Sequence, residues 1–99
     1  MSQHPQSSKP IQFSKHAREQ MLLRGATEEE VTQTIREEKW MPAKRDKHQA
    51  KRRFHFGKLS PVNRKEYRYK EIEPIFVEES DAVVVVTIKV YYTNEEETR

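Results

Sequence analysis

Cations that alternate with apolar side chains are the residues of this sequence that offer the most chemistry. The segments Arg53-Phe54-His55-Phe56 and Tyr67-Arg68-Tyr69-Lys70 alternate in this way, and residues 83–92 are rich in β-branched side chains. Because successive side chains of a β-strand point to opposite faces, this pattern predicts strands with one buried and one open face. With the aromatic residues of the two segments placed inward, the open face carries Arg53, His55, Arg68, Lys70, Thr87, Lys89 and Tyr91.

Such a face is suited to phosphate, because guanidinium and ammonium groups donate charge-assisted hydrogen bonds to phosphate oxygens. An imidazole on this face, that of His55, is suited to general acid or base catalysis. The alternative interpretation is that these residues only keep the protein in solution, since exposed sheet faces often carry Lys, Arg and Thr for that reason. A slip of register by one residue would instead turn Tyr67 and Tyr69 outward, where they would stack on bases.

A block of basic residues precedes the first alternating segment. The formal net charge of the chain is only +3, and the acids gather at 28–30, 37–38 and 71–81. A basic block in a nearly balanced chain indicates a local contact with an anion, most commonly a nucleic acid, or else a solvated loop. The block, which is interrupted by Asp46, consists of Lys44, Arg45, Lys47, Lys51, Arg52 and Arg53.

His16 and Arg24 form a second candidate pair, eight residues apart in a predicted helix. Eight residues make about two helical turns, so both side chains lie on roughly the same side of that helix. In a functional interpretation His16 is an acid or base and Arg24 holds a phosphate. In a structural one, which we favour, His16 bonds at the junction of helix and sheet and Arg24 bonds carbonyl groups at the helix C-terminus.

Several classes of site are excluded by composition. The chain has no cysteine, which removes disulfides, thiolate nucleophiles and the common zinc sites. Its four histidines lack a short ligand spacing, and no Gly-rich phosphate loop, Ser nucleophile elbow or paired-carboxylate motif is present. We therefore expect no metal and no cofactor. The sequence has no apolar run long enough to cross a membrane and no signal peptide, which predicts a cytoplasmic protein.

Capping residues predict two helices before the strands. Ser14 precedes a helix over 15–24 that Gly25 ends, and Thr27 with Glu30 forms a capping box for a helix that ends near Glu38. Residues 43–50 are expected to form a loop. Strands follow at 53–56, 67–70, 75–77 and 83–92, so the order is ααββββ, or ααβββ if 67–77 is one bent strand. We predict an α+β domain in which a helical hairpin packs on a three- to four-stranded antiparallel sheet.

The predicted domain spans residues 11–92, between a disordered tail at 1–10 and an acidic tail at 93–99. In its last strand Val84, Val86, Ile88, Val90 and Tyr92 are expected to face the helices. Only 33% of the residues are hydrophobic, so the core is small and a homodimer or another partner is expected to support it.

Two parts of the sequence resemble a bacterial family of small domains of unknown function. The first is Ser14-Lys15-His16-Ala17 followed by Met21, Arg24, Gly25 and the acidic helix start at 28–31; the second is Val85-Val86-Thr87-Ile88. That family is similar in fold to the RelE/ParE and BrnT toxins of toxin–antitoxin pairs. The resemblance implies helices before a twisted sheet, RNA as a substrate, and an antitoxin-like protein as a partner. Several of these toxins cut RNA without metal, using Arg, Lys, His and Tyr. The acidic residues 95–97 depart from the basic end of BrnT-like toxins.

Two hypotheses follow. In the first the protein is a metal-independent endoribonuclease that acts on the open face, because such cleavage needs a base, an acid and cations around the phosphate. In the second it is a non-catalytic module that binds nucleic acid, a protein partner or a second copy of itself. The catalytic candidates are His55, Arg68, Tyr91 and His16. The candidates for nucleic-acid binding are Lys51, Arg52, Arg53, Lys70, Lys89 and Arg24.

Overall fold

Both predicted helices form, and their caps are those that the sequence indicates. The computed structural model describes residues 9–97 of the 99-residue chain. Helix α1 (Lys15–Arg24) begins at Ser14, whose hydroxyl accepts a bond from the Ala17 amide, and it ends at Gly25 in the left-handed conformation with φ 86°. Helix α2 (Glu28–Glu37) begins with the capping box of Thr27 and Glu30. Neither helix is long and apolar enough to cross a membrane.

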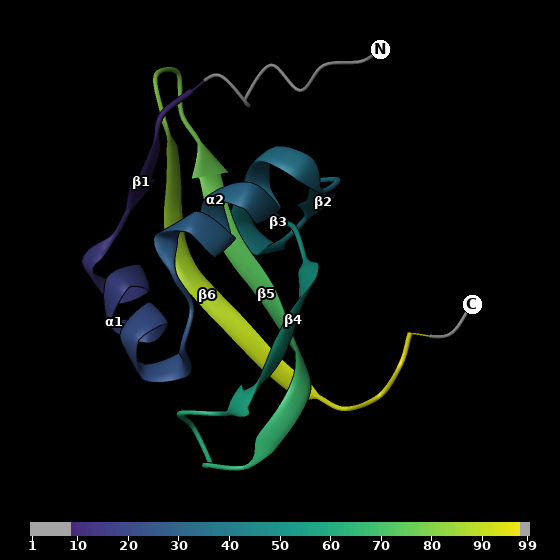
Figure 1. Cartoon of the computed structure of the whole chain (residues 1–99). Coiled ribbons are helices and arrows are strands. Elements are labelled where there is room, and N and C mark those ends of the chain that lie inside the picture. The colour runs from purple at the N-terminus through teal and green to yellow at the C-terminus, as the bar shows by residue number, and fades with distance from the viewer. Residues whose placement is uncertain (1–8, 98–99) are drawn as a thin grey trace.

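The helices cover one face of a six-stranded sheet, so the predicted α+β class is confirmed (Figure 1). Along the sheet the order is β1-β6-β5-β3-β2, and β4 pairs with β5 on the same edge as β3. A short 3-10 turn at Lys44–Asp46 lies between β2 and β3. The strands are β1 (Ile11–Phe13), β2 (Met41–Pro42), β3 (His48–Gln49), β4 (Arg52–Leu59), β5 (Glu66–Glu78) and β6 (Val83–Thr93).

The prediction of a purely antiparallel sheet is wrong, because β1 runs parallel to β6. Ile11 pairs with Val83 and Phe13 with Val85, which places the start of the chain beside its last strand (Figure 1). A strand of three residues is too short to show an alternating pattern in the sequence. Residues 9 and 10, which we assigned to the tail, also contact the sheet: Lys9 pairs with Glu78 at 2.9 Å, and the Pro10 carbonyl accepts from the Val83 amide. The rest of the predicted tail at 1–10 lies outside the described residues.

The core fills the space between the helices and the sheet. Ala17, Met21, Val31 and Ile35 come from the helices. They pack against Ile72, Phe76, Val83, Val85 and Ile88 of the two long strands. Trp40 closes one end of this layer, with its ring edge-on to Phe76 at 4.6 Å and its indole N–H bonded to the Ile35 carbonyl. Burial of these apolar side chains is the main force that holds the helices on the sheet.

A β-bulge in β6 overturns the predicted orientation of its first half. Ile75 pairs with Thr87 but Phe76 pairs with Val85, so Val86 is an extra residue without an opposite partner. An extra residue inverts the alternation, and the side chains before it change faces. As a result Val83 and Val85 are buried, whereas Val84 and Val86, which we expected to be inward, are partly exposed. Beyond the bulge Ile88 and Val90 face the core as predicted.

The orientation predicted for residues 67–70 of β5 is wrong at Lys70. The buried residues Ile72 and Phe76 set the inward parity of this strand, and Lys70 shares it. Its ammonium group is buried at the junction of the two helices, where it donates to the Gly25 carbonyl at 2.8 Å and pairs with Glu30 at 2.9 Å. Tyr69 consequently points away from the helices, beside His55.

Candidate anion-binding face of the sheet

The sheet face opposite the helices, which we call the open face, holds most of the predicted site residues. Arg53 pairs with Glu71 and Glu71 with Tyr91, so their side chains lie in one row across three strands. The next row contains His55 and Tyr69, and Lys89 lies opposite Glu73 in the row on the other side. Arg53 and His55 thus occupy the side that the alternation of β4 predicts.

Two carboxylates that we did not predict there, Glu71 and Glu73, lie at the centre of the open face and reduce its positive charge. Glu71 accepts two bonds from Arg53, at 2.8 and 3.0 Å, and pairs with Lys51 at 3.4 Å. Glu73 accepts from the Tyr91 hydroxyl at 2.9 Å. Burial and this bond raise the pKa of Tyr91, which keeps its proton in place at neutral pH. Ile72 is the residue that could have predicted the outward position of Glu71 and Glu73. It is a buried apolar residue between them, and its two neighbours in the strand must point to the opposite face.

The four catalytic candidates are not brought together. His55 and Tyr91 share the open face, but β5 lies between their strands, which separates them by about 10 Å across the sheet. Arg68 pairs with Glu96 near the C-terminal end of the described chain. His16 lies exposed on α1, in the layer that covers the other face. No single phosphate can contact all four.

Most of the candidates for nucleic-acid binding have internal partners. Besides Arg53 and Lys51, Arg52 pairs with Glu38 at 2.6 Å and with Glu37 at 3.3 Å. Arg24 donates to the Ile88 carbonyl at 3.2 Å, so it binds a strand carbonyl rather than the end of its own helix. Lys70 is buried and cannot reach a ligand. Within residues 9–97, Lys89 alone of the six predicted cations has no ion pair, hydrogen bond or ring contact.

Lys89 lies at the rim of a hollow on the open face, which we call the lysine hollow. Its volume is about 470 Å³. The bulge residues Val86 and Thr87 line it together with Ile75, and the β2–β3 connection supplies two more lysines. The full lining is Ala43, Lys44, Lys47, Gln49, Ile75, Val86, Thr87 and Lys89.

Backbone geometry places the two further lysines. Arg45 and Asp46 have positive φ angles of 60° and 61°, which turn the chain sharply between β2 and β3. The Lys47 carbonyl accepts from the Ala43 amide at 2.8 Å and closes this turn. Among the described residues the ammonium groups of Lys44 and Lys47, like that of Lys89, have no ion pair or hydrogen bond. Three lysines without an ion pair among the described residues therefore surround one concave site, and two of them belong to the basic block noted in the sequence.

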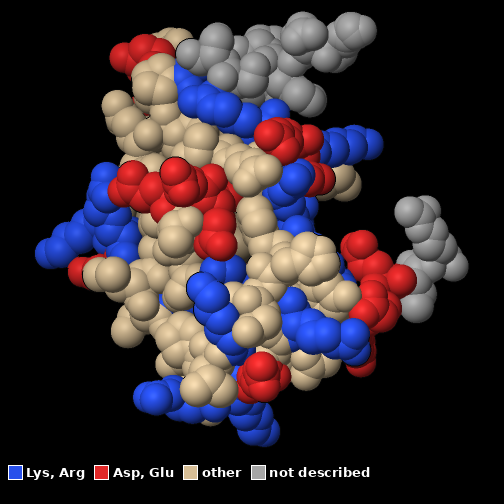
Figure 2. Space-filling view, viewed as in Figure 1, with Lys and Arg blue, Asp and Glu red and all other residues tan. Residues whose placement is uncertain are grey.

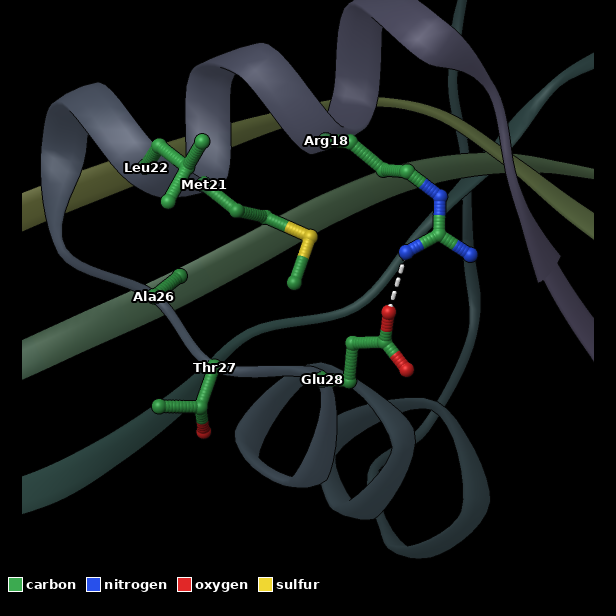
Figure 3. Close-up of a pocket in the computed structure, with 6 residues that line it drawn as sticks. All are labelled: Arg18, Met21, Leu22, Ala26, Thr27 and Glu28. Atoms are coloured by element: carbon green, nitrogen blue, oxygen red, sulfur yellow. Dashed lines mark hydrogen bonds and ion pairs between the residues drawn. The ribbon is translucent and has the colours of Figure 1, made fainter.

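Other parts of the surface carry side chains of both charges. Acidic side chains gather at the start of α2 and beside the C-terminal end of the described chain, with Lys and Arg side chains near them (Figure 2). A hollow of about 350 Å³ lies between α1 and α2, where Arg18 and Glu28 are ion-paired across the opening (Figure 3). Because its two charges satisfy each other, this hollow has no free charge for an ionic ligand.

Comparison of the chain with protein-family models, with curated proteins and with solved structures gives no significant match. The function is therefore argued from the open face itself. Within the described residues no group of His, Asp and Glu side chains has the arrangement of a metal site.

Proposed function

We propose that this protein is a non-catalytic module that binds the phosphate backbone of RNA through the lysine hollow. The observation that carries the proposal is the gathering of three lysines without an ion pair around one concave site, whereas Arg53 on the same face is paired with Glu71. A lysine ammonium is a flexible point charge, suited to phosphate oxygens in any sequence context. The resemblance to RelE/ParE and BrnT toxins supports RNA as the nucleic acid.

The chemistry of the lining fits a nucleotide backbone. The Thr87 hydroxyl and the Gln49 amide lie among the lysines and can donate to phosphate or ribose oxygens. Ile75 and Val86 supply an apolar floor for the carbon atoms of a sugar. The separation of His55, Arg68, Tyr91 and His16 supports binding without cleavage, because acid, base and phosphate clamp do not meet.

Salt dependence tests the proposal. Three phosphate contacts to single-stranded RNA predict that log K falls against log salt with a slope of about −2. Fluorescence anisotropy with a labelled single-stranded RNA, in chelator, measures this slope. Lys89→Ala is expected to reduce its magnitude by roughly 0.7. Lys15→Ala removes the same charge from the exposed start of α1 and is the matched control, expected to bind like the wild type.

Three results would contradict the proposal. Equal effects of the Lys89 and Lys15 variants would show that only net charge matters. Cleavage of the RNA in chelator would establish an enzyme. No RNA binding, together with a stable dimer in light scattering, would indicate a protein-interaction module.

A further inference from the structure

The acidic segment after β6 folds back onto the end of the open face away from the lysine hollow. The Asn94 side chain accepts a bond from the Arg68 amide at 2.7 Å, which fixes the path of the chain as it leaves the strand. The Glu95 carbonyl accepts from the Arg53 guanidinium at 2.7 Å. The Glu96 carboxylate accepts from Arg68 at 3.0 Å and from the Tyr69 hydroxyl at 2.7 Å. Residues 94–96 thus contact three donor side chains at once.

These three donors form a preorganised group. The Arg53 guanidinium lies over the Tyr69 ring at 4.6 Å and is held by Glu71 through two hydrogen bonds. The His55 ring also contacts the Tyr69 ring, with 5.6 Å between the two ring centroids. The remaining Nη1 of Arg53, the two terminal nitrogens of Arg68 and the Tyr69 hydroxyl all donate to the segment. Such donors bind carboxylate and phosphate alike, because both groups present negatively charged oxygens.

We infer that Arg53, Arg68 and Tyr69 form a second phosphate-binding site, and that the segment 94–96 of the same chain occupies it in the absence of RNA. The inference rests on the proposed function, since RNA is the ligand that displaces the segment. Tyr69 lies about 13 Å along the sheet from the row of Lys89, so one short strand of RNA can reach both sites. Of the two carboxylates on this path, Glu71 is paired with Arg53, and Glu73, opposite Lys89, accepts a hydrogen bond from the Tyr91 hydroxyl.

The contacts of the segment are weak enough for displacement. The side chains of Arg68 and Glu96 are each 63% exposed, and an ion pair so open to water is only marginally stabilising. A backbone phosphate of RNA carries one negative charge and presents two unesterified oxygens, as a carboxylate does, so it can compete for the same donors. The segment therefore lowers the apparent affinity for RNA without blocking it.

Removing one charge tests the inference. Glu96→Gln is expected to bind single-stranded RNA roughly three- to tenfold more tightly at low salt, the ratio expected for loss of one exposed ion pair and its neighbouring hydrogen bond. Glu97→Gln makes the same change in net charge at a residue without a contact among residues 9–97, and less than about a twofold change is expected. Arg68→Gln added to Glu96→Gln is expected to cancel the gain.

A measurement without RNA tests whether the acidic segment is bound to Arg53, Arg68 and Tyr69. The hydrogen bond from Tyr69 to Glu96 raises the pKa of this tyrosine. An NMR titration of the tyrosine rings is expected to show a lower Tyr69 pKa in Glu96→Gln and an unchanged one in Glu97→Gln.

The outcomes separate the two proposals. Wild-type binding that Glu96→Gln does not strengthen, or that Glu97→Gln strengthens equally, would overturn the second site and leave the lysine hollow standing. An unchanged Tyr69 titration in Glu96→Gln would overturn the occupied state. If no variant binds RNA, the proposed function fails and the second site fails with it.

Discussion

Replacement of Lys70 by methionine gives the sharpest test of the assignment of Lys70 to the core. The Lys70 side chain is only 6% exposed, and its ammonium group joins β5 to the junction of α1 and α2 through Gly25 and Glu30. It also lies over the Phe56 ring at 5.1 Å. Methionine has a similar length and no charge, so Lys70→Met removes the ion pair and leaves the packing nearly intact.

The expected loss of stability depends on how well the Glu30 carboxylate is solvated once Lys70 is replaced. Removal of one partner of a fully buried ion pair costs about 3–5 kcal/mol. Glu30 is 22% exposed and keeps its bond from the Thr27 amide, so water can solvate part of its charge. We therefore expect a loss of about 2–3 kcal/mol in the free energy of unfolding. For a chain of this size the expected fall in Tm is roughly 10–20 °C.

Urea denaturation at neutral pH, followed by the fluorescence of Trp40, measures this loss, because Trp40 packs on the core residue Phe76. Glu30→Gln and the double variant complete a cycle, in which a coupling of about 1–3 kcal/mol is expected. A loss below about 1 kcal/mol in Lys70→Met would refute the reasoning. RNA affinity that falls more in Lys70→Met than in Lys15→Ala would instead support the outward orientation that the sequence predicts.

Three further predictions concern the α1 caps and the tyrosines. Gly25→Ala is expected to cost about 2–4 kcal/mol in urea unfolding, because φ is +86° and the new Cβ would lie 2.6 Å from the Tyr92 hydroxyl. Ser14→Ala is expected to cost about 1 kcal/mol in the same assay, since the α1 amide of Ala17 loses its cap. Burial raises the pKa of Tyr91, so its stabilising contribution is complete below its ordinary pKa and is lost as pH rises through the higher folded value. Tyr91→Phe is therefore expected to lose less stability than the wild type as the pH rises above 10.0, the ordinary pKa of tyrosine.

Local signals in the sequence were sufficient to predict the helices. The side chains of Ser14, Thr27 and Glu30 accept hydrogen bonds from backbone amides three residues away. Gly25 adopts the left-handed conformation that ends α1, so neither helix boundary depends on a distant contact. The alternation of Phe54 and Phe56 likewise predicted the outward side of β4 correctly, because no bulge interrupts Arg53–His55.

Features that depend on a distant partner were not predictable. The bulge at Val86 arises from the pairing of β6 with β5, and the run of valines around it gives no sign of where the alternation inverts. Lys70 was placed outward because the tyrosines that alternate with it were placed inward, and its partner Glu30, which holds it in the core, lies 40 residues away. Of the candidate site, the sequence indicated Lys89 and the basic block. The position of Lys44 and Lys47 beside Lys89 depends on how the β2–β3 turn docks.

The parallel pairing of β1 with β6 has a consequence for the order in which the protein can acquire its structure. The Ser14 hydroxyl bonds the Val86 carbonyl across 72 residues, and α1 packs on the same strand. The ribosome makes α1 early, and a helix of 10 residues is marginal in water when it has nothing to pack on. Because β6 lies between β1 and β5, β1 has no strand to pair with and β5 lacks the partner on one of its edges until residues 83–93 are synthesised. A nascent chain arrested before Val83 is therefore expected to remain open to proteases and chaperones along most of its length, and folding then proceeds in one cooperative step.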